Sequence, residues 1–187
     1  MKVGITGHSK GIGKAINVVL TSNGYDVIGF SRSNGVDIGT EEGRKIVIDS
    51  LKDIDIFINN AYHPEGQTEL LKIALKEWKG TNKFVINLSS KMVFYPGTGF
   101  EDYVTAKKVQ NEIIKSTMLS AHPKVLNLLL GAVDTDMAKV WLSPKIDPNV
   151  LANFIYNMIK YQNILAVQEV TIDVPDLDWK DIKLCQI

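Results

Sequence analysis

The stretch Thr6–Gly13 carries three glycines between two different apolar patterns. A short apolar run precedes it, and the residues after it repeat apolar positions with helical spacing, namely Ile12, Ala15, Ile16, Val19 and Leu20. A strand, a glycine-rich turn and a helix in this order can hold the phosphates of a dinucleotide. Glycines let backbone N–H groups approach the phosphate, and the helix N-terminus adds a favourable dipole. Such turns also open many helices that bind nothing, so this stretch alone leaves both interpretations open.

Composition and length describe one ordinary globular domain. The 187 residues suffice for one sizeable core but are few for two, so we expect a single domain over 1–187. Lys+Arg and Asp+Glu are equal at 21 each, which gives no net attraction to nucleic acid or to an anionic membrane. The chain has one cysteine, Cys185, no secretory signal and no membrane-spanning apolar run, which together predict a cytoplasmic protein.

Short apolar runs alternate with helical periodicity along the chain. We expect strands over 2–6, 25–30, 54–58, 83–89, 124–130 and 168–174, and helices near 11–22, 40–52, 67–78, 101–121 and 147–161. Several strand runs are continuously apolar, which is typical of strands buried on both faces of a parallel sheet. The alternation predicts an α/β fold of the Rossmann type, with a doubly wound parallel sheet of about six strands between two helical layers.

The second expected strand ends at Ser31-Arg32-Ser33, where a dinucleotide fold meets the adenosine ribose. A carboxylate there would accept a hydrogen bond from a free 2′-hydroxyl, whereas an arginine suits a 2′-phosphate. Arg32 occupies this place, and Lys10 of the glycine turn is expected on the same side. The two cations favour NADP(H) over NAD(H). The alternative is that both are solvated surface charges.

Polar residues also follow the third and fourth expected strands. Asn59-Asn60-Ala61 ends the third, where ligands bind in such sheets, although asparagines also satisfy ordinary turns. Ser90 ends the fourth, and the next helix carries Tyr103 and Lys107 four residues apart, on one face. A phenol has a pKa of about 10, and a neighbouring ammonium lowers that pKa toward neutrality. These residues therefore predict an acid–base tyrosine beside a serine that holds a carbonyl.

The Tyr-x-x-x-Lys pattern recurs at Tyr156 and Lys160. This second pair lies on the last helix, which is expected to pack on the core, and no strand ending in serine precedes it. We therefore interpret it as structural. Ser90, thirteen positions before Tyr103, distinguishes the first pair.

Together and in this order, these residues resemble the classical short-chain dehydrogenase/reductase family, over nearly the whole chain. The resemblance implies an NADP(H)-dependent oxidoreductase that transfers a hydride between nicotinamide and a small carbonyl or alcohol substrate. It implies that Tyr103 gives or takes the oxygen proton, that Lys107 lowers the Tyr103 pKa and binds the nicotinamide ribose, and that Ser90 positions the oxygen. The other cofactor-binding residues that it implies are Gly7, Ser9, Lys10, Gly11, Ile12, Gly13, Arg32, Asp37, Asn60, Ala61, Gly131, Val133 and Thr135.

The chain departs from the family in length and in several positions. It is shorter than usual, so we expect six strands in the order 2-1-3-4-5-6. The asparagine that completes the family's catalytic set belongs to the part that is missing between Asn60 and Ser90. His63 either supports a substitute proton path or is an exposed loop histidine, and Tyr62 replaces a small residue. The loop from Ala138 to Lys145, with Trp141, is a short substrate lid and predicts an open pocket.

The remaining expectations concern partners and an alternative function. No His/Cys/carboxylate cluster predicts a metal site. Members of this family usually form oligomers, so we expect a homodimer, with a tetramer as the alternative. The missing asparagine and the short lid also leave open a catalytically weak or inactive NADP(H)-binding sensor or partner-binding module. The segment 175–187 matches no motif of the family.

Overall fold

The structure, a computed structural model, describes residues 1–95, 97, 99–117 and 123–175 of the 187. The end of the helix expected to reach residue 121, most of the segment 175–187 and Cys185 lie outside the described residues. Within them, no helix is long and apolar enough to cross a membrane.

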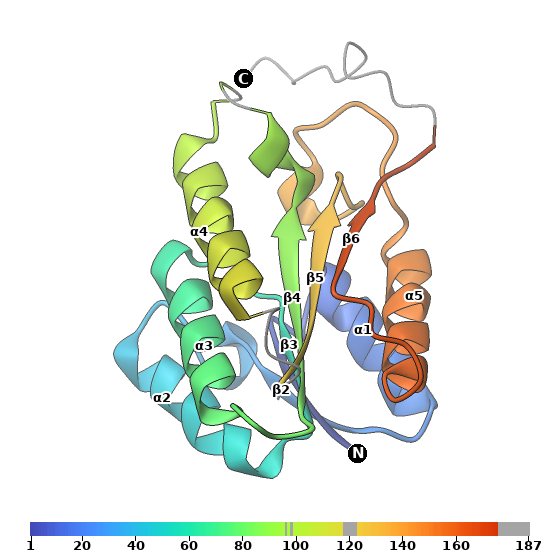
Figure 1. The fold of residues 1–187 in the computed structure, drawn as a ribbon. Helices are drawn as coiled ribbons and strands as arrows, with labels where there is room; N and C mark the ends of the chain where they lie inside the picture. The colour runs from blue at the N-terminus through green and yellow to red at the C-terminus, as the bar shows by residue number, and fades with distance from the viewer. Residues whose placement is uncertain (96, 98, 118–122, 176–187) are drawn as a thin grey trace.

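Six parallel strands form a single sheet in the order β2-β1-β3-β4-β5-β6, which confirms the expected order (Figure 1). The strands are β1 (Lys2–Thr6), β2 (Asp26–Phe30), β3 (Ile56–Asn59), β4 (Phe84–Ser90), β5 (Lys124–Leu130) and β6 (Glu169–Ile172). All four residues of β3 and all seven of β4 are buried, as the continuous apolar runs predict for strands at the centre of a parallel sheet.

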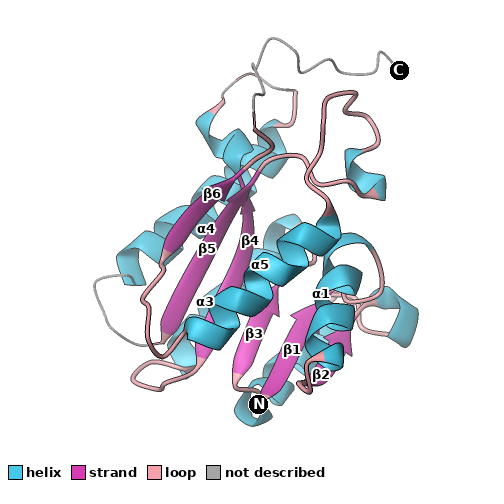
Figure 2. Ribbon diagram, turned by 90° about the vertical axis from the view of Figure 1, so that its right-hand side faces the viewer, coloured by secondary structure: helices cyan, strands magenta, loops and turns pink. Residues whose placement is uncertain are grey.

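Helices cover both faces of the sheet (Figure 2). On one face lie α1 (Gly11–Ser22) and α5 (Pro148–Tyr161), and on the other lie α2 (Glu41–Ser50), α3 (Pro64–Glu77) and α4 (Glu101–Thr117). Alternate strand residues feed two separate cores, because Ile56 and Ile58 face α1 and α5 whereas Phe57 faces the other three helices. The α/β/α prediction is therefore confirmed.

Helix α3 begins three residues before the expected start at residue 67. Pro64 takes the first helical position, and His63 is the N-cap, with its Nδ1 accepting a hydrogen bond from the Gly66 N–H at 3.0 Å. Histidine is not a usual capping residue, which is why the sequence pattern missed it. His63 is thus a half-buried cap. It is therefore not the exposed loop histidine of the alternative interpretation.

Candidate active site

The glycine turn after β1 has a geometry that side chains would block. Gly7 and Gly11 adopt φ angles of +73° and +51°, which disfavour other residues. A Cβ on Gly13 would lie 2.2 Å from the Gly7 carbonyl oxygen, so only glycine fits where α1 packs against the turn. The N–H of Gly7 donates to the Phe30 carbonyl at 2.6 Å and ties the turn to the end of β2. These contacts build an open backbone cradle at the N-terminus of α1.

Asn60 holds this cradle in place. Its Nδ2 donates to the Thr6 carbonyl at 2.8 Å, and the buried Thr6 hydroxyl accepts from the N–H groups of Asn60 and Ala61 at 3.0 Å each. The expected cofactor residues Asn60 and Ala61 therefore adjoin the glycine turn, and the amide of Asn60 is engaged with its backbone.

The N-terminus of α1 is suited to an anion. Lys10 is its N-cap and makes no side-chain capping bond, and the first turn contains no acidic residue. Ser9 and Ile12 are half-buried in the turn. Thr135 reaches it from the segment after β5, since a Cβ on Gly11 would lie 3.0 Å from the Thr135 Cγ2. The structure thus brings the glycine turn and Thr135 together across the sheet.

Val133 and Gly131, in the same segment after β5, are placed by packing. Val133 is buried and forms an isolated parallel bridge with Ile146. A Cβ on Gly131 would collide with the carboxylate of Asp173, which forms an ion pair with Lys91, the residue after Ser90. Gly131 thereby makes room for a contact that joins the ends of β4 and β6.

The residues expected to bind the adenosine part of the cofactor are either exposed to solvent or hydrogen-bonded within a turn. Arg32 opens the short helix η1 (Arg32–Asn34) and is exposed, as is Lys10. Neither forms an ion pair within the part of the chain that the structure describes. Asp37 accepts a hydrogen bond from the Gly39 N–H at 2.9 Å and so shapes the turn before α2. Both cations are therefore available to a phosphate.

Ser90, Tyr103 and Lys107 come together at the carboxyl end of β4. Tyr103 lies beside Ser90, whose Oγ accepts from the Met92 N–H at 3.2 Å and donates to the Leu130 carbonyl at 3.5 Å. The Lys107 Nζ lies 5.6 Å from the centre of the Tyr103 ring. It donates to the carbonyl oxygen of Leu88 at 2.7 Å. The same nitrogen donates to the Oε1 of Gln67 at 2.7 Å.

The pKa values of the Tyr103 and Lys107 pair correct one expectation. We expected Lys107 to lower the pKa of Tyr103, but that pKa is raised, because burial outweighs the lowering by the Ser90 hydrogen bond, and the Tyr62 phenol raises it further. Burial also lowers the pKa of Lys107 from 10.5 to about 7, because it disfavours the ammonium. Burial thus weakens the preference of this lysine for its charged form, and its amine donates to Gln67 and Leu88.

Two neighbours of this pair were not identified as functional from the sequence. The Tyr62 ring packs edge-on to Tyr103, with 4.8 Å between the ring centres, and the Lys107 Nζ lies 5.6 Å from its centre. Gln67 is fully buried. In the sequence, Gln67 has the helical spacing of the apolar residues Leu70, Leu71 and Ala74. A polar residue on such an apolar helix face could have indicated a functional role for Gln67.

A hollow of about 350 Å³ opens beside Tyr103. It is lined by Tyr62, Gly99, Phe100, Glu101, Asp102 and Tyr103. Trp141, from the short loop expected as a lid, packs against Phe100 with 5.7 Å between the ring centres. The hollow thus adjoins the Tyr103 side chain on the side that faces Phe100.

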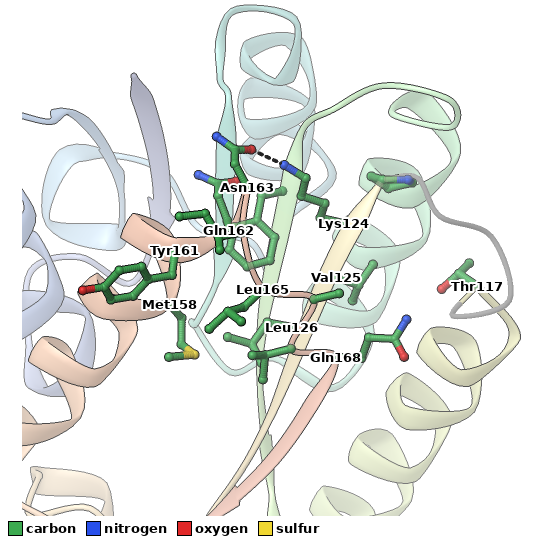
Figure 3. A pocket seen from close by; sticks show the side chains of 15 residues that line it. Thr117, Lys124, Val125, Leu126, Met158, Tyr161, Gln162, Asn163, Leu165 and Gln168 are labelled. Atoms are coloured by element: carbon green, nitrogen blue, oxygen red, sulfur yellow. Dashed lines mark hydrogen bonds between the residues drawn. The ribbon is translucent and has the colours of Figure 1, made fainter.

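A second cavity, of about 240 Å³, lies at the opposite end of the sheet (Figure 3). It is formed where β4 and β5 begin and where the chain leaves α5 for β6, and Lys124 there donates to Asn163 at 2.6 Å. None of the candidate catalytic or cofactor-binding residues lines it. Within the described ranges, no group of three His, Cys, Asp or Glu side chains is arranged to hold a metal ion.

Comparison with known proteins adds information on the fold. No protein-family model and no curated protein matches the sequence. Among solved structures, the alcohol dehydrogenase from the archaeon Thermococcus sibiricus, complexed with 5-hydroxy-NADP, is similar with a TM-score of 0.76 at 19% identity. The match covers 95% of this chain and 98% of that one.

Two further structures match over similar lengths. A short chain dehydrogenase from Burkholderia cenocepacia in complex with NADP has a TM-score of 0.74 at 17% identity, covering 92% of this chain and 88% of that one. The 3-ketoacyl-(acyl-carrier-protein) reductase from Brucella melitensis, complexed with NADH, has a TM-score of 0.75 at 17% identity, covering 92% and 96%. At these identities the similarity concerns the fold. The chain has the fold of the short-chain dehydrogenases/reductases.

Proposed function

We propose that this protein is an NADP(H)-dependent oxidoreductase acting on a small carbonyl or alcohol. The observation that carries the proposal is the grouping of Ser90, Tyr103 and Lys107 at the same edge of the sheet as the glycine cradle. Parallel sheets of this kind bind ligands outside the carboxyl ends of their strands. The fold that the chain shares with nicotinamide-binding dehydrogenases and reductases supports the same conclusion.

The residues present fit a dinucleotide. The cradle around Gly13 excludes any side chain, and no acidic residue opposes a phosphate in the first turn of α1. Gly7, Ser9, Gly11 and the residues that follow would hold the pyrophosphate, and Lys10 would reach toward the 2′-phosphate. Asn60, Ala61 and Lys107 would hold the nicotinamide ribose, and Gly131, Val133 and Thr135 the carboxamide. The cofactor supplies or accepts the hydride.

The chain's own residues would handle the oxygen and its proton. Ser90 would donate a hydrogen bond to the substrate oxygen, and Tyr103 would give that oxygen a proton or take one from it. Tyr103 would act as the protonated phenol when a carbonyl is reduced, although burial raises its pKa and so makes it a weaker acid in the cofactor-free protein. Trp141 and Phe100 would exclude water on one side of the substrate.

The experiment that tests this proposal is a turnover assay with NADPH and NADH over a panel of aldehydes, ketones and alcohols. Consumption or formation of reduced nicotinamide, measured by its absorbance, is the expected result. If the protein bound neither dinucleotide, the proposal would fail.

A second function is favoured by one observation, the packing of the Tyr62 ring against Tyr103 and near Lys107. A ring in this position narrows the access to both groups. We therefore also consider a catalytically weak or inactive NADP(H)-binding sensor or partner-binding module. Tight NADPH binding without turnover of any substrate in the panel would favour the sensor.

The preference for NADP(H) over NAD(H) rests on Arg32 and Lys10. Both are exposed and without an ion pair in the described part of the chain, so each can pair with a 2′-phosphate. Arg32→Ala and Lys10→Ala are each expected to weaken NADPH binding about tenfold, with a change of less than about twofold for NADH. Lys52→Ala, at an exposed lysine near the start of β3, is the matched control. Equal losses for both dinucleotides would contradict the 2′-phosphate assignment.

The assembly and location stay predictions. We propose a single domain that forms a homodimer in the cytoplasm, with α3 and α4, which pack against each other, as the elements nearest the interface. Light scattering on the purified protein measures the oligomeric state.

A further inference from the structure

Gln67 is held at both ends of its side-chain amide. It is the fourth residue of α3 and has no exposed surface. Its Nε2 donates to the carbonyl oxygens of Asn59 at 2.9 Å and Leu88 at 3.2 Å. Since these acceptors fix the nitrogen, the Oε1 must point the other way, toward Lys107. It accepts from the Lys107 Nζ at 2.7 Å and from the Gln110 Nε2 at 3.4 Å.

Lys107 has no carboxylate partner among the residues that the structure describes. Only 3% of its surface is exposed, and no ion pair in the described part of the chain includes it. The titratable groups that face it are the phenols of Tyr103, on α4, and Tyr62, before α3. Strand β4 presents a carbonyl and α3 presents the amide of Gln67. Gln67 is thus the side chain that accepts a hydrogen bond from the buried amine at this site.

We infer that Gln67 is a positioning residue that fixes the Lys107 amine beside Tyr103 and stabilises its charged form. An amide oxygen attracts an ammonium less strongly than a carboxylate does, so it holds the lysine without fully restoring its charge. A lysine held in this way can carry or release its proton near neutral pH. A contribution of Gln67 to catalysis rests on the proposed function, whereas the hydrogen bond between Gln67 and Lys107 is independent of it.

A row of three asparagines on the sheet holds the main chain of Gln67 in place. Asn59, Asn87 and Asn127 lie side by side in register on β3, β4 and β5. The Asn59 Nδ2 donates to the backbone carbonyl of Gln67 and to the Asn87 Oδ1, both at 3.0 Å, and the Asn87 Nδ2 donates to the Asn127 Oδ1 at 3.1 Å. All three are fully buried. Gln67 is therefore fixed through its main chain as well as its side chain, as the support of a functional group must be.

The direct test is the pKa of Lys107, measured by NMR titration of its ¹³Cε resonance without cofactor or substrate. In Gln67→Glu a carboxylate replaces the amide at hydrogen-bond distance, and the pKa should rise by about 1 to 3 units. In Gln67→Leu the acceptor is lost, and the pKa should fall below the wild-type value. Gln67→Glu keeps the size of the side chain but turns the Nε2 donor to Asn59 and Leu88 into an oxygen. Gln67→Met is therefore made as well, and it should lower the Lys107 pKa as Gln67→Leu does.

The matched control is Asn111→Leu. Asn111 is also a buried amide, on the same helix as Lys107, but it accepts from Ser89 and Asn127 and does not contact the lysine. Its loss should leave the Lys107 pKa within about 0.3 units of wild type. An unchanged pKa in both Gln67 variants, or an equal shift in the control, would overturn the inference.

A second measurement separates this inference from the proposed function. If the protein turns over a substrate, the pH dependence of kcat/KM in Gln67→Glu should shift in the same direction as the Lys107 pKa, because kcat/KM reports groups of the free enzyme. A purely structural glutamine would lower kcat without moving the profile, which would contradict the positioning role. If wild type shows no turnover while the pKa responds as expected, the proposed function fails and the role of Gln67 in holding Lys107 stands.

Discussion

Helices α4 and α5 carry the same Tyr-x-x-x-Lys pattern in different surroundings. On α4, Lys107 is buried and bonded to Gln67 and Leu88. On α5, Lys160 is exposed, and its Nζ lies 5.5 Å from the ring centre of its neighbour Tyr161. Each tyrosine meets another ring edge-on, Tyr103 with Tyr62 and Tyr156 with Tyr25.

The difference shows what the spacing leaves open. A separation of four residues places a tyrosine and a lysine on one face of a helix, and it does so equally well in both helices. Whether the tyrosine and the lysine can act on a substrate depends on the residues that pack against that face of the helix. α4 places its pair against the carboxyl end of β4 and Ser90, whereas α5 packs against α1, away from any strand end with a serine. Burial then shifts the pKa of Lys107 to about 7.

The largest difference between the tyrosines of α4 and α5 is expected in the rate of turnover. Tyr103→Phe removes the phenol that exchanges a proton with the substrate oxygen and should lower kcat by about 10²- to 10⁴-fold with little change in NADPH binding. Tyr156→Phe makes the same chemical change on α5 and should leave kcat within about twofold of wild type. Steady-state kinetics and a binding titration on both variants measure this. Equal effects of the two substitutions would erase the distinction between the helices.

The second contrast concerns stability against pH. The folded-state pKa of Lys107, about 7, lies below the unfolded value of 10.5, so between these pH values the unfolded chain binds more protons than the folded one. The free energy of unfolding of wild type, compared with Lys107→Met, should therefore rise across this window, by on the order of 1–4 kcal/mol, and stay flat below about pH 7. Urea denaturation at several pH values measures it.

Lys160→Met is the control for this experiment. Because Lys160 is exposed, its replacement should leave the pH dependence of stability parallel to that of wild type. A wild-type curve that also runs parallel to that of Lys107→Met would mean that Lys107 is not buried in solution.

The sequence predicts the frame of this molecule better than the electrostatics of its site. The positions of the strands follow from the apolar runs and the cradle follows from three glycines, because both depend on local pattern. The order of the strands came from the resemblance to the family. The raised pKa of Tyr103 and the partner of Lys107 depend on how α3 packs against α4, which no spacing encodes. Gln67 and Lys107 are forty positions apart, so their contact exists only in the folded chain.

The smallest contrast concerns the role of Tyr156 itself. If α5 uses its tyrosine for packing, the edge-on contact with Tyr25, with 6.3 Å between ring centres, should contribute to stability. A double-mutant cycle with Tyr25→Leu and Tyr156→Leu should give a coupling energy of about 0.5–1.5 kcal/mol in the free energy of unfolding. Neither substitution should alter the ratio of NADPH to NADH affinity. A coupling near zero would leave Tyr156 without the packing role assigned to it, and burial alone would then have to explain why the two helices differ.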